Sequence, residues 1–356
     1  MTNTKKITFI IGSMSSGGAE RVVSIIANEY ARQGWQVDIL MLLSSACTYI
    51  LEPNIALIDL SGKCSSRIAR LPYWLTKIRK YAHENRPDII VSFVARINII
   101  TKLSLINIDI PIIVSERNDP YMDGRGLIVR YLTKKLYPLA SAVVLQTRRA
   151  QGYFCSLKNS IIISNPIEVH ASKSEMAKNR IVSIGRLSEQ KNQKMLIDAF
   201  SKIHQKYPKY TLDIYGEGSL RSTLQKQIES LNLDSCVTLR GAVSDVHQQI
   251  ADAKLFVLSS DYEGLSNALL EAMMMGLPCI STNCAGSDEY IEHLKNGLLV
   301  DVGDTNAMAT AIEYMISHPS EAKQMGTCAK HKSQSFEKNN VIKQWTNIIN
   351  TSISKS

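Results

Sequence analysis

The feature that most constrains the fold of this chain is an alternation of short apolar runs with amphipathic segments, which occurs twice along the sequence. The apolar runs have the length and composition of strands buried on both faces, and the segments between them carry apolar residues at helical spacing. Strands that alternate with helices form parallel sheets with crossover helices. The sequence therefore predicts two α/β domains, and its 356 residues are enough for both.

Both sets can be placed along the chain. In the first we expect strands at residues 7–12, 35–43, 88–93, 111–115, 142–146 and 161–164, and a helix at 19–32. In the second we expect strands at 181–184, 211–215, 237–239, 255–258 and 278–281, and helices at 192–207 and 220–231. The expected division is a domain at 1–168, a polar linker at 169–179, a domain at 180–335 and a C-terminal helix within 336–356 that packs back toward the first domain. Ligands of such sheets bind beyond the carboxyl ends of the strands, so two doubly wound, Rossmann-like domains would face a central cleft.

The net charge of +9 is carried entirely by the first half of the chain. Residues 1–170 contain 21 Lys and Arg against 12 Asp and Glu, whereas residues 171–356 contain 20 of each. A one-sided basic surface favours an anionic partner such as a membrane or a phosphorylated lipid, although it could also serve solubility alone. The basic stretches lack a recognised nucleic-acid-binding motif, so we expect no nucleic-acid partner.

Cysteine usage and hydropathy limit the class of protein further. The seven cysteines are odd in number and form no CxxC pair, which favours free thiols in a reducing cytosol over disulfides or a structural zinc site. No run of about 18 apolar residues is present, so we expect no membrane-spanning helix. The apolar run after Lys6 has no small-residue cleavage site behind it, and we therefore expect no signal peptide.

The strongest chemical signal follows the expected strand 255–258. A helix is expected to start at Gly264, and a helix that starts at the end of a strand presents free N–H groups to a phosphate or a polar sugar. Glu263 would lie at this helix start and Glu271 two turns further on, roughly 12 Å along the axis. The two carboxylates would then be too far apart to act as acid and base on one atom. Taken alone, two such glutamates are usually solvated.

Two further turns could contact phosphates. A strand that ends at Gly185 is followed by Arg186 and Lys191 before the next helix, and these cations could neutralise a diphosphate. The turn with Gly17 and Gly18 joins the first strand to the first helix and would let a ligand approach the backbone closely. It has neither the GxGxxG spacing of a dinucleotide site nor the pattern of a P-loop. Each feature alone is also compatible with an ordinary surface.

Together, these segments resemble the retaining GT-B glycosyltransferases of family four. The hallmark of that family is an E-x7-E element, which Glu263 and Glu271 match. The resemblance covers nearly the whole chain and is densest in the C-terminal half. The other matching segments are Gly17-Gly18-Ala19-Glu20, Asn165-Pro166, Gly185-Arg186-Leu187, Gln190-Lys191-Asn192, Gly276-Leu277-Pro278 and Gly297-Leu298-Leu299-Val300.

The resemblance implies a UDP-sugar donor, retention of the anomeric configuration, and no metal or other cofactor; the chain contains no DxD triplet. It assigns Arg186 and Lys191 to the donor diphosphate and Glu271 to the ribose hydroxyls. Glu263 would face the donor sugar. The remaining donor-site positions that it implies are Gly17, Gly18, Gly185 and the backbone amides of Gly264, Leu265 and Ser266.

The first domain departs from the family pattern at one place. Many members carry a histidine after the strand that ends near residue 115, whereas this chain has Glu116, Arg117 and Asn118 there. A Ser-Glu-Arg-Asn variant occurs in similar bacterial enzymes that build surface glycans. These three residues are therefore candidates for contacts near the reacting centre, although Glu116 and Arg117 could instead form a structural salt bridge.

Two stretches of the first domain combine cations with apolar residues and contain no acid. Basic amphipathic helices of this kind lie on anionic membranes, where a lipid-diphosphate acceptor could be bound. The apolar faces could equally belong to the core. The cations that we expect at the acceptor or the membrane are Arg67, Arg70, Lys77, Arg79 and Lys80 in the first stretch and Arg125, Arg130, Lys134 and Lys135 in the second.

These expectations combine into one function. The chain would be a cytoplasmic enzyme, peripheral on the inner face of the cytoplasmic membrane. It would transfer a hexose or N-acetylhexosamine from a UDP-sugar to a polyprenyl-diphosphate-linked saccharide in bacterial glycan biosynthesis. Two alternatives stay open, namely a nucleotide-sugar-binding protein without transferase activity and an epimerase or phosphorylase on the same fold.

Overall fold

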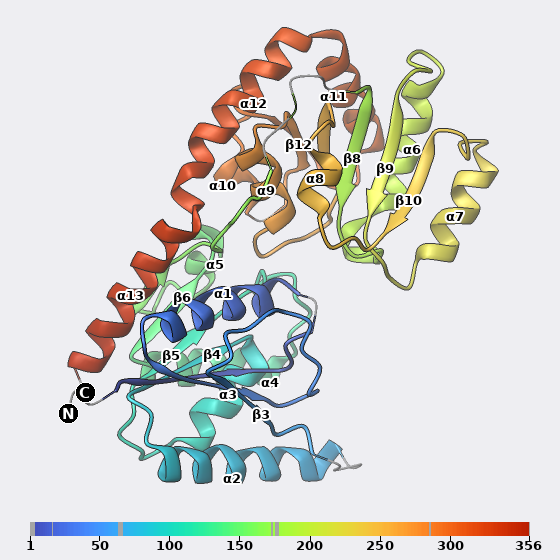
Figure 1. Cartoon of the computed structure of the whole chain (residues 1–356). Helices are drawn as coiled ribbons and strands as arrows, with labels where there is room; N and C mark the ends of the chain where they lie inside the picture. Colours follow the sequence, from blue (N-terminus) through green and yellow to red (C-terminus); the bar gives the residue numbers. More distant parts are fainter. Residues whose placement is uncertain are drawn as a thin grey trace. The chain divides into compact units, whose positions relative to one another are not determined.

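The computed structural model describes residues 4–15, 17–62, 67–171, 174, 178–284 and 286–355. The chain divides into two compact units (Figure 1). Unit 1 comprises Met1–Pro166 and Asn339–Ser356, and unit 2 comprises Ile167–Lys338. Each unit contains one parallel sheet with helices on both faces, so the predicted fold class of two doubly wound, Rossmann-like domains is confirmed.

The sheet of unit 1 has the strand order β3-β2-β1-β4-β5-β6-β7. Its strands are β1 (Lys6–Ile11), β2 (Gln36–Met41), β3 (Ile55–Asp59), β4 (Ile89–Phe93), β5 (Ile112–Ser115), β6 (Ala142–Leu145) and β7 (Ser160–Ile162). Its helices are α1 (Gly18–Arg32), α2 (Arg67–Asn85), α3 (Ala95–Ser104), α4 (Leu127–Leu136), the 3-10 turn η1 (Tyr137–Leu139), α5 (Arg148–Tyr153) and α13 (Lys338–Ser354). The chain order reverses at β1, which places a topological switch point at the carboxyl end of this strand.

Strand β1 shows why helices cover both faces of this sheet. Phe9 lies in one core and Ile10 in the other, because successive side chains of a strand alternate between the two faces. The core around Phe9 also contains Val23 of α1 and Trp345 of α13. The core around Ile10 contains Trp74 of α2. An apolar run without polar alternation is what a strand buried on both faces requires.

The sheet of unit 2 has the strand order β10-β9-β8-β11-β12-β13. Its strands are β8 (Arg180–Ile184), β9 (Thr211–Tyr215), β10 (Val237–Gly241), β11 (Leu255–Leu258), β12 (Cys279–Thr282) and β13 (Leu298–Val300). Its helices are η2 (Glu189–Lys191), α6 (Gln193–His204), α7 (Arg221–Ser230), α8 (Val246–Ile250), α9 (Asn267–Met275), α10 (Ser287–Tyr290), α11 (Thr305–Ser317), α12 (Pro319–Ser333) and η3 (Gln334–Phe336). The chain order of this sheet reverses at β8, which lies between β9 and β11. The segment with Arg186 and Lys191 follows β8, and the segment with Glu263 follows β11.

Helix α13 returns the chain to unit 1 and completes its core. Val341, Trp345 and Ile349 are fully buried there. The Trp345 ring stacks on the Phe93 ring at a centroid distance of 6.0 Å. Across the described residues, no helix combines the length and hydropathy needed to cross a bilayer.

Candidate active site

In unit 2, the Glu263 carboxylate meets the Lys191 ammonium. The two groups form a hydrogen-bonded ion pair through Glu263 Oε1. Ser260 Oγ donates to the same oxygen at 2.7 Å. Glu263 is 5% exposed, so its charge is largely removed from water and is compensated by these two donors. The motif after β8 and the motif after β11 therefore form one site.

Backbone and side-chain bonds hold these two segments together. Asn192 Nδ2 donates to Asp261 Oδ1 at 2.7 Å, and Gln190 Nε2 donates to the Tyr262 carbonyl at 2.9 Å. The Asp261 N–H donates to the Gln190 carbonyl at 2.9 Å. Because three bonds join the segments on either side of the ion pair, the site is organised before any ligand binds.

The sequence placed the start of the helix after β11 three residues too early. Helix α9 begins at Asn267, and Ser266 is its N-cap, whose hydroxyl accepts from the Leu269 N–H. Glu263 precedes this helix, so the expected separation of two helical turns between Glu263 and Glu271 does not apply. Gly264, Leu265 and Ser266 are buried in the turn that leads into α9. A serine at N-cap competes with the helical conformation of its own residue, which explains the later start.

Gly185 and Arg186 follow β8, and the Arg186 side chain is exposed. The sequence interpretation missed the glycines that support this turn. A Cβ atom on Gly216 would lie 2.0 Å from the Gly185 carbonyl oxygen, and one on Gly218 would lie 2.2 Å from the Leu187 carbonyl oxygen. Only glycine allows these two backbones to approach so closely. The Gly-x-Gly pattern directly after the β9 strand was the available signal.

Glu271 lies on α9 and is 2% exposed. Its Oε2 lies 3.1 Å from Nε2 of His247, which is itself buried. His247 belongs to α8 and was not among the expected site residues. A single histidine in a short polar helix carries no signal of this contact, since the pairing depends on tertiary structure.

The glycine turn in unit 1 precedes α1. Gly17 is the N-cap residue of this helix and has an extended backbone, and Gly18 is the first helical residue. The Tyr49 hydroxyl donates to the Gly17 carbonyl at 2.8 Å and accepts from the Gly17 N–H at 3.2 Å. The turn is therefore fixed to the segment that follows β2.

The three residues after β5 have three different environments. Glu116 is buried and accepts from Arg125 Nη1 at 3.2 Å and from the Tyr137 hydroxyl at 2.8 Å. Burial raises the pKa of Glu116, and the nearby Arg125 charge opposes that rise. Asn118 is exposed. The possible salt bridge between Glu116 and Arg117 is not formed, because Arg125 pairs with Glu116 instead.

Arg117 is buried beside two aromatic rings that stack on each other. Its guanidinium carbon lies 5.4 Å from the Phe93 ring centroid and 5.5 Å from the Trp345 ring centroid. Its Nη1 donates to Asn165 Oδ1 at 2.9 Å, while Nε and Nη2 have no hydrogen-bond partner in the part of the chain that the structure describes. Burial lowers the pKa of Arg117 to about 9.

Family models match both halves of the chain. Residues 16–170 match the model described as glycosyltransferase family 4, and residues 166–332 match the model described as glycosyl transferases group 1. The chain belongs to the family 4 glycosyltransferases. Two curated bacterial relatives show which members of this family it resembles.

The glycosyltransferase is 28% identical to a Campylobacter jejuni enzyme named as an alpha-1,4-N-acetyl-D-galactosaminyltransferase of a PP-undecaprenol-linked saccharide, over 97% of this chain and 98% of the relative. It is 24% identical to the amylovoran biosynthesis glycosyltransferase AmsD of Erwinia amylovora, over 97% and 99%. The enzyme is thus related to bacterial enzymes of lipid-linked glycan biosynthesis.

Solved structures show the same fold. HepE of Anabaena in complex with UDP and glucose has a TM-score of 0.84 at 21% identity, over 98% of this chain and all (100%) of that one. Sucrose-phosphate synthase from Thermosynechococcus elongatus has a TM-score of 0.87 at 17% identity, over 99% and 100%.

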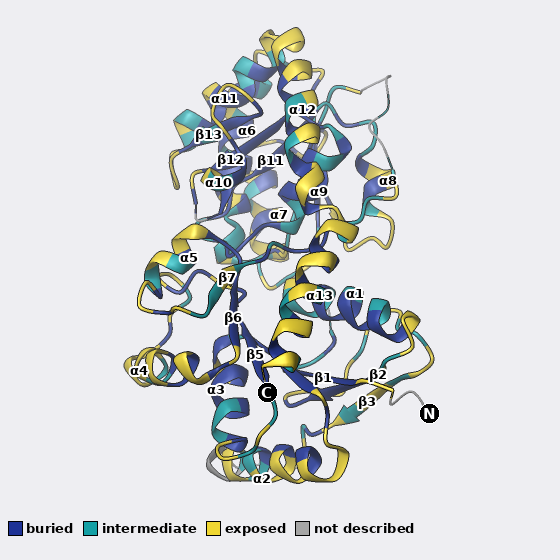
Figure 2. Ribbon diagram, turned by 90° about the vertical axis from the view of Figure 1, so that its left-hand side faces the viewer, coloured by how far each residue is buried: buried dark blue, intermediate teal, exposed yellow. Residues whose placement is uncertain are grey.

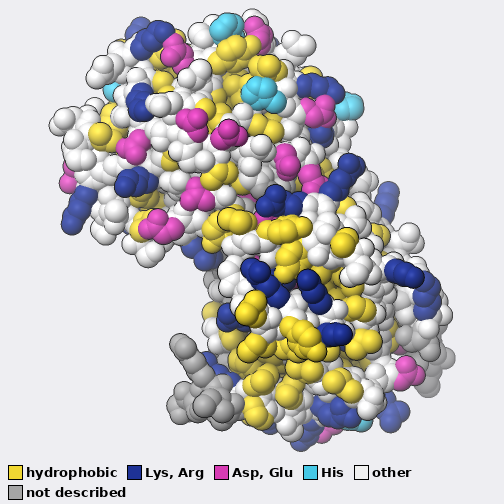
Figure 3. Space-filling view, turned by 180° about the vertical axis from the view of Figure 1, so that it is seen from behind, with side chains coloured by type: hydrophobic (Ala, Val, Ile, Leu, Met, Phe, Trp, Pro, Cys, Tyr) yellow, Lys and Arg dark blue, Asp and Glu magenta, His cyan; other side chains and the backbone are white. Residues whose placement is uncertain are grey.

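The two basic stretches of the glycosyltransferase differ in what they expose. On α4, Leu127, Ile128 and Tyr131 are 83%, 76% and 62% exposed, and Arg130, Lys134 and Lys135 are exposed with them. Figure 2 draws α4 largely in the colour of exposed residues, and Figure 3 shows hydrophobic side chains gathered among lysines and arginines on this face of unit 1. Leu127, Ile128 and Tyr131 are therefore not part of the core, whereas Leu136 at the end of α4 is buried.

The prediction that Arg125 belongs to this exposed surface is wrong. Arg125 precedes α4, and its side chain is 2% exposed. It pairs with Glu116 and, through Nη2, with Asp123 at 2.5 Å. These two carboxylates offset the cost of removing the Arg125 guanidinium from water, and the sequence pattern of alternating cations and apolar residues does not show them.

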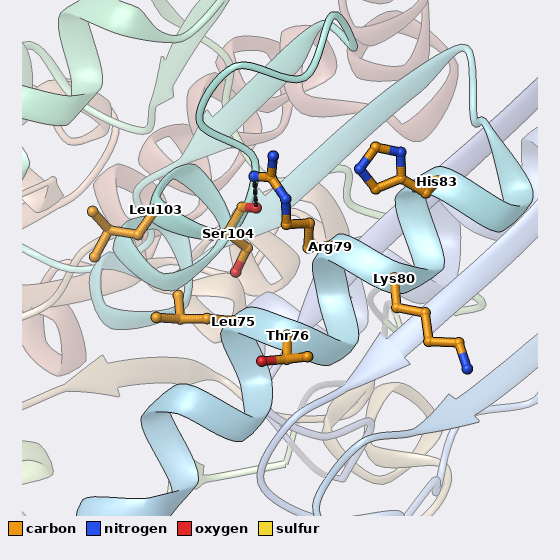
Figure 4. Close-up of a pocket in the computed structure, with 7 residues that line it drawn as sticks. All are labelled: Leu75, Thr76, Arg79, Lys80, His83, Leu103 and Ser104. Carbon is orange, nitrogen blue, oxygen red and sulfur yellow. Dashed lines mark hydrogen bonds between the residues drawn. The ribbon is translucent and has the colours of Figure 1, made fainter.

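Helix α2 buries its apolar face instead. Trp74 and Ile78 belong to the core of unit 1. Arg79 Nη1 donates to the carbonyls of Ser104 and Ile106 at the end of α3, at 3.2 and 2.9 Å. Lys77 and Lys80 are exposed, Arg70 is half-buried, and the Arg67 side chain lies outside the described part of the chain. A groove of about 390 Å³ between α2 and α3 is shown in Figure 4; its lining residues are Leu75, Thr76, Arg79, Lys80, His83, Leu103 and Ser104.

Proposed function

We propose that the enzyme transfers a hexose or N-acetylhexosamine from a UDP-sugar to a saccharide linked to a polyprenyl diphosphate, with retention of the anomeric configuration. The observation that carries this proposal is the ion pair between Lys191 and Glu263, because it joins the motifs expected at the diphosphate and at the donor sugar. HepE, solved with UDP and glucose, supports the donor class. The Campylobacter relative, named for a PP-undecaprenol-linked saccharide, supports the acceptor class.

The charges of the site suit the departure of a diphosphate. In the reaction, the bond between the anomeric carbon and the diphosphate oxygen breaks, a hydroxyl oxygen of the acceptor bonds to that carbon, and the hydroxyl proton is released. Lys191, Arg186 and the first N–H groups of α9 would stabilise the charge that develops on the leaving UDP. With this charge supplied by the protein, we infer that the reaction needs no metal or other cofactor.

Glu263 is proposed to contact the donor sugar. It is paired with Lys191 in the structure, and a bound diphosphate would compete for that ammonium. Ser260 would then remain as the donor that orients the carboxylate. Glu271 is proposed to accept from the ribose hydroxyls, and the contributions of Gly17, Gly18 and Gly185 rest on the family resemblance alone.

On the acceptor side, exposure separates the three residues after β5. Asn118 is exposed, and we propose that it contacts the acceptor. Glu116 is buried with Arg125 and Tyr137, which suits a role in holding this loop. We propose that Nε and Nη2 of Arg117, which have no hydrogen-bond partner among the described residues, donate to an oxygen of the acceptor.

Helix α4 is proposed to bind the membrane that contains the lipid-linked acceptor. Leu127, Ile128 and Tyr131 would enter the boundary between head groups and acyl chains. Arg130, Lys134 and Lys135 would contact anionic head groups or the acceptor diphosphate. We propose the inner face of the cytoplasmic membrane as the location of the enzyme, where a UDP-sugar and a lipid-linked acceptor would both be available.

The proposal can be tested by UDP release from purified enzyme. UDP-N-acetylgalactosamine, UDP-N-acetylglucosamine, UDP-galactose and UDP-glucose would each be offered with and without polyprenyl-diphosphate-linked saccharides. We expect release from one donor only when an acceptor is present. Release that needs no acceptor, or no release with any donor, would contradict transfer.

A further inference from the structure

Glu271 is held by a histidine from a separate helix. The His247 ring of α8 reaches α9 and places Nε2 at 3.1 Å from Glu271 Oε2. The side chains of both residues are buried, with 7% and 3% exposed. The hydrogen bond from His247 offsets part of the free-energy cost of burying the Glu271 carboxylate, which a carboxylate without a donor would bear in full.

A second bond assigns the proton of the His247 ring. The main-chain N–H of His170 approaches Nδ1 at 3.4 Å, so Nδ1 is the acceptor and Nε2 carries the proton. Nε2–H then donates to Glu271. The rings of His170 and His247 are 5.9 Å apart, which fixes the plane of the imidazole further. Three segments that are distant in the sequence therefore define one orientation of the carboxylate.

We propose that His247 is a positioning residue, which orients the Glu271 carboxylate toward the ribose hydroxyls of the nucleotide. This inference rests on the proposed role of Glu271. A glutamate side chain has three rotatable torsions, and fixing them before the nucleotide binds reduces the entropy lost on binding. Loss of the histidine should therefore weaken nucleotide binding through the ribose and leave the transfer step nearly unchanged.

The test compares UDP with 2′,3′-dideoxy-UDP, which lacks the hydroxyls that Glu271 would bind. We expect His247→Ala to raise the Kd for UDP about tenfold, as expected for loss of a hydrogen bond to a charged group. The Kd for the dideoxy analogue should not change. The KM for the donor should rise with the Kd for UDP, whereas kcat should stay within about twofold of wild type.

Two further variants complete the comparison. His247→Gln retains an N–H donor near the position of Nε2 and should recover most of the affinity for UDP. His331→Ala, an exposed histidine of α12, should bind both nucleotides like wild type. Unfolding curves of all variants would show whether His247→Ala is folded, and the ratio of the two Kd values does not depend on the folded fraction.

The outcomes separate this inference from the function on which it rests. Equal weakening of UDP and the dideoxy analogue in His247→Ala, or no weakening of UDP, would overturn the positioning role. If Glu271→Ala binds both nucleotides with the wild-type affinities, Glu271 does not contact the ribose, and the proposed role of Glu271 fails first. Transfer measured with these variants reports separately on the proposed reaction.

Discussion

Glu263 and Glu116 are both buried carboxylates, and they differ in the partners that compensate their charge. Glu263 is paired with a lysine whose side chain is 19% exposed, so a polar ligand can compete for that lysine. Glu116 is paired with an arginine whose side chain is 2% exposed and with the buried Tyr137. The first arrangement suits exchange with a substrate, and the second suits a permanent structural role.

Replacement of Glu263 by glutamine should abolish most transfer while the fold survives. The amide is nearly isosteric but removes the charge that faces Lys191 and that we propose to face the donor sugar. Loss of such a group costs about 100-fold or more in rate. Acceptor-dependent UDP release measures the effect. Glu189→Gln, an exposed glutamate of η2, is the matched control. Wild-type activity of Glu263→Gln would remove this residue from the chemistry.

Removal of Arg125 should destabilise the enzyme in a pH-dependent way. Arg125→Met leaves the Glu116 carboxylate buried without its cation, which costs about 3–5 kcal/mol of unfolding free energy at pH 8. The pKa of Glu116 is already raised by burial, and it should rise further once the opposing Arg125 charge is lost. Because the pKa of Glu116 is raised in the folded state, the loss of stability appears as the pH rises through that pKa. Below that pKa the carboxyl is protonated, and the stability is recovered.

Urea unfolding at pH 5 and pH 8 measures this difference. The destabilisation by Arg125→Met should be smaller at pH 5, where Glu116 can take up a proton. Lys135→Met, at an exposed cation of α4, should change stability little at either pH. An equal loss of stability at both pH values would show that the charge of Glu116 is not the cause.

Helices α2 and α4 share a sequence pattern but differ in whether their apolar residues are buried. Both carry cations interleaved with apolar residues. Trp74 of α2 packs in the core of unit 1, whereas Leu127 of α4 is 83% exposed. An exposed apolar face flanked by cations marks an interaction surface, so the membrane prediction belongs to α4.

Neutralising the cations of α4 should reduce binding to anionic liposomes. Each cation near such a surface contributes about 1 kcal/mol, so the triple variant of Arg130, Lys134 and Lys135 to Gln should bind about 100-fold more weakly. The double variant of Lys77 and Lys80 to Gln on α2 is the comparison and should bind more strongly than the triple one. Sedimentation with liposomes at low and high salt measures this. Unchanged binding of the α4 variant would contradict the assignment.

The helices and strands that could be predicted from the sequence are those whose apolar residues are buried. Strands with apolar residues on both faces, such as β4 and β11, were expected within one residue of their observed bounds. Strand β3 was missed because it is an edge strand with mostly exposed or half-buried residues. The start of α9 was misplaced because Ser266 caps it with its own side chain. At the site, Lys191 and Glu263 were predictable from motifs, whereas His247 and the burial of Arg125 depend on contacts between distant segments.

At the scale of the whole molecule, each unit has its own sheet and cores, and unit 1 is completed by the end of the chain. Trp345 of α13 is fully buried against Phe93 and Arg117. The residues that precede unit 2 and those that follow it thus share one hydrophobic core. The stability of unit 1 therefore depends on a helix that the chain supplies only after unit 2.

Truncation of this tryptophan should destabilise the protein without altering the donor site. Trp345→Ala removes a large buried ring and should cost about 3–5 kcal/mol of unfolding free energy. The Kd for UDP should stay close to its wild-type value, because the side chains proposed to contact UDP, those of Lys191, Arg186 and Glu271, lie in unit 2. Urea unfolding and UDP titration of the folded variant measure the two quantities. Ile348→Ala, at a partly buried position of α13, should cost less.

Glycosyl transfer from a UDP-sugar with retention can be established from the structure of the product. A UDP-α-sugar would be incubated with a polyprenyl-diphosphate-linked saccharide, and the anomeric proton of the product would be recorded by NMR. We predict an acceptor extended by one α-linked sugar, with one UDP released for each sugar transferred. A β-linked product would contradict retention, and UDP that appears without an extended acceptor would contradict glycosyl transfer.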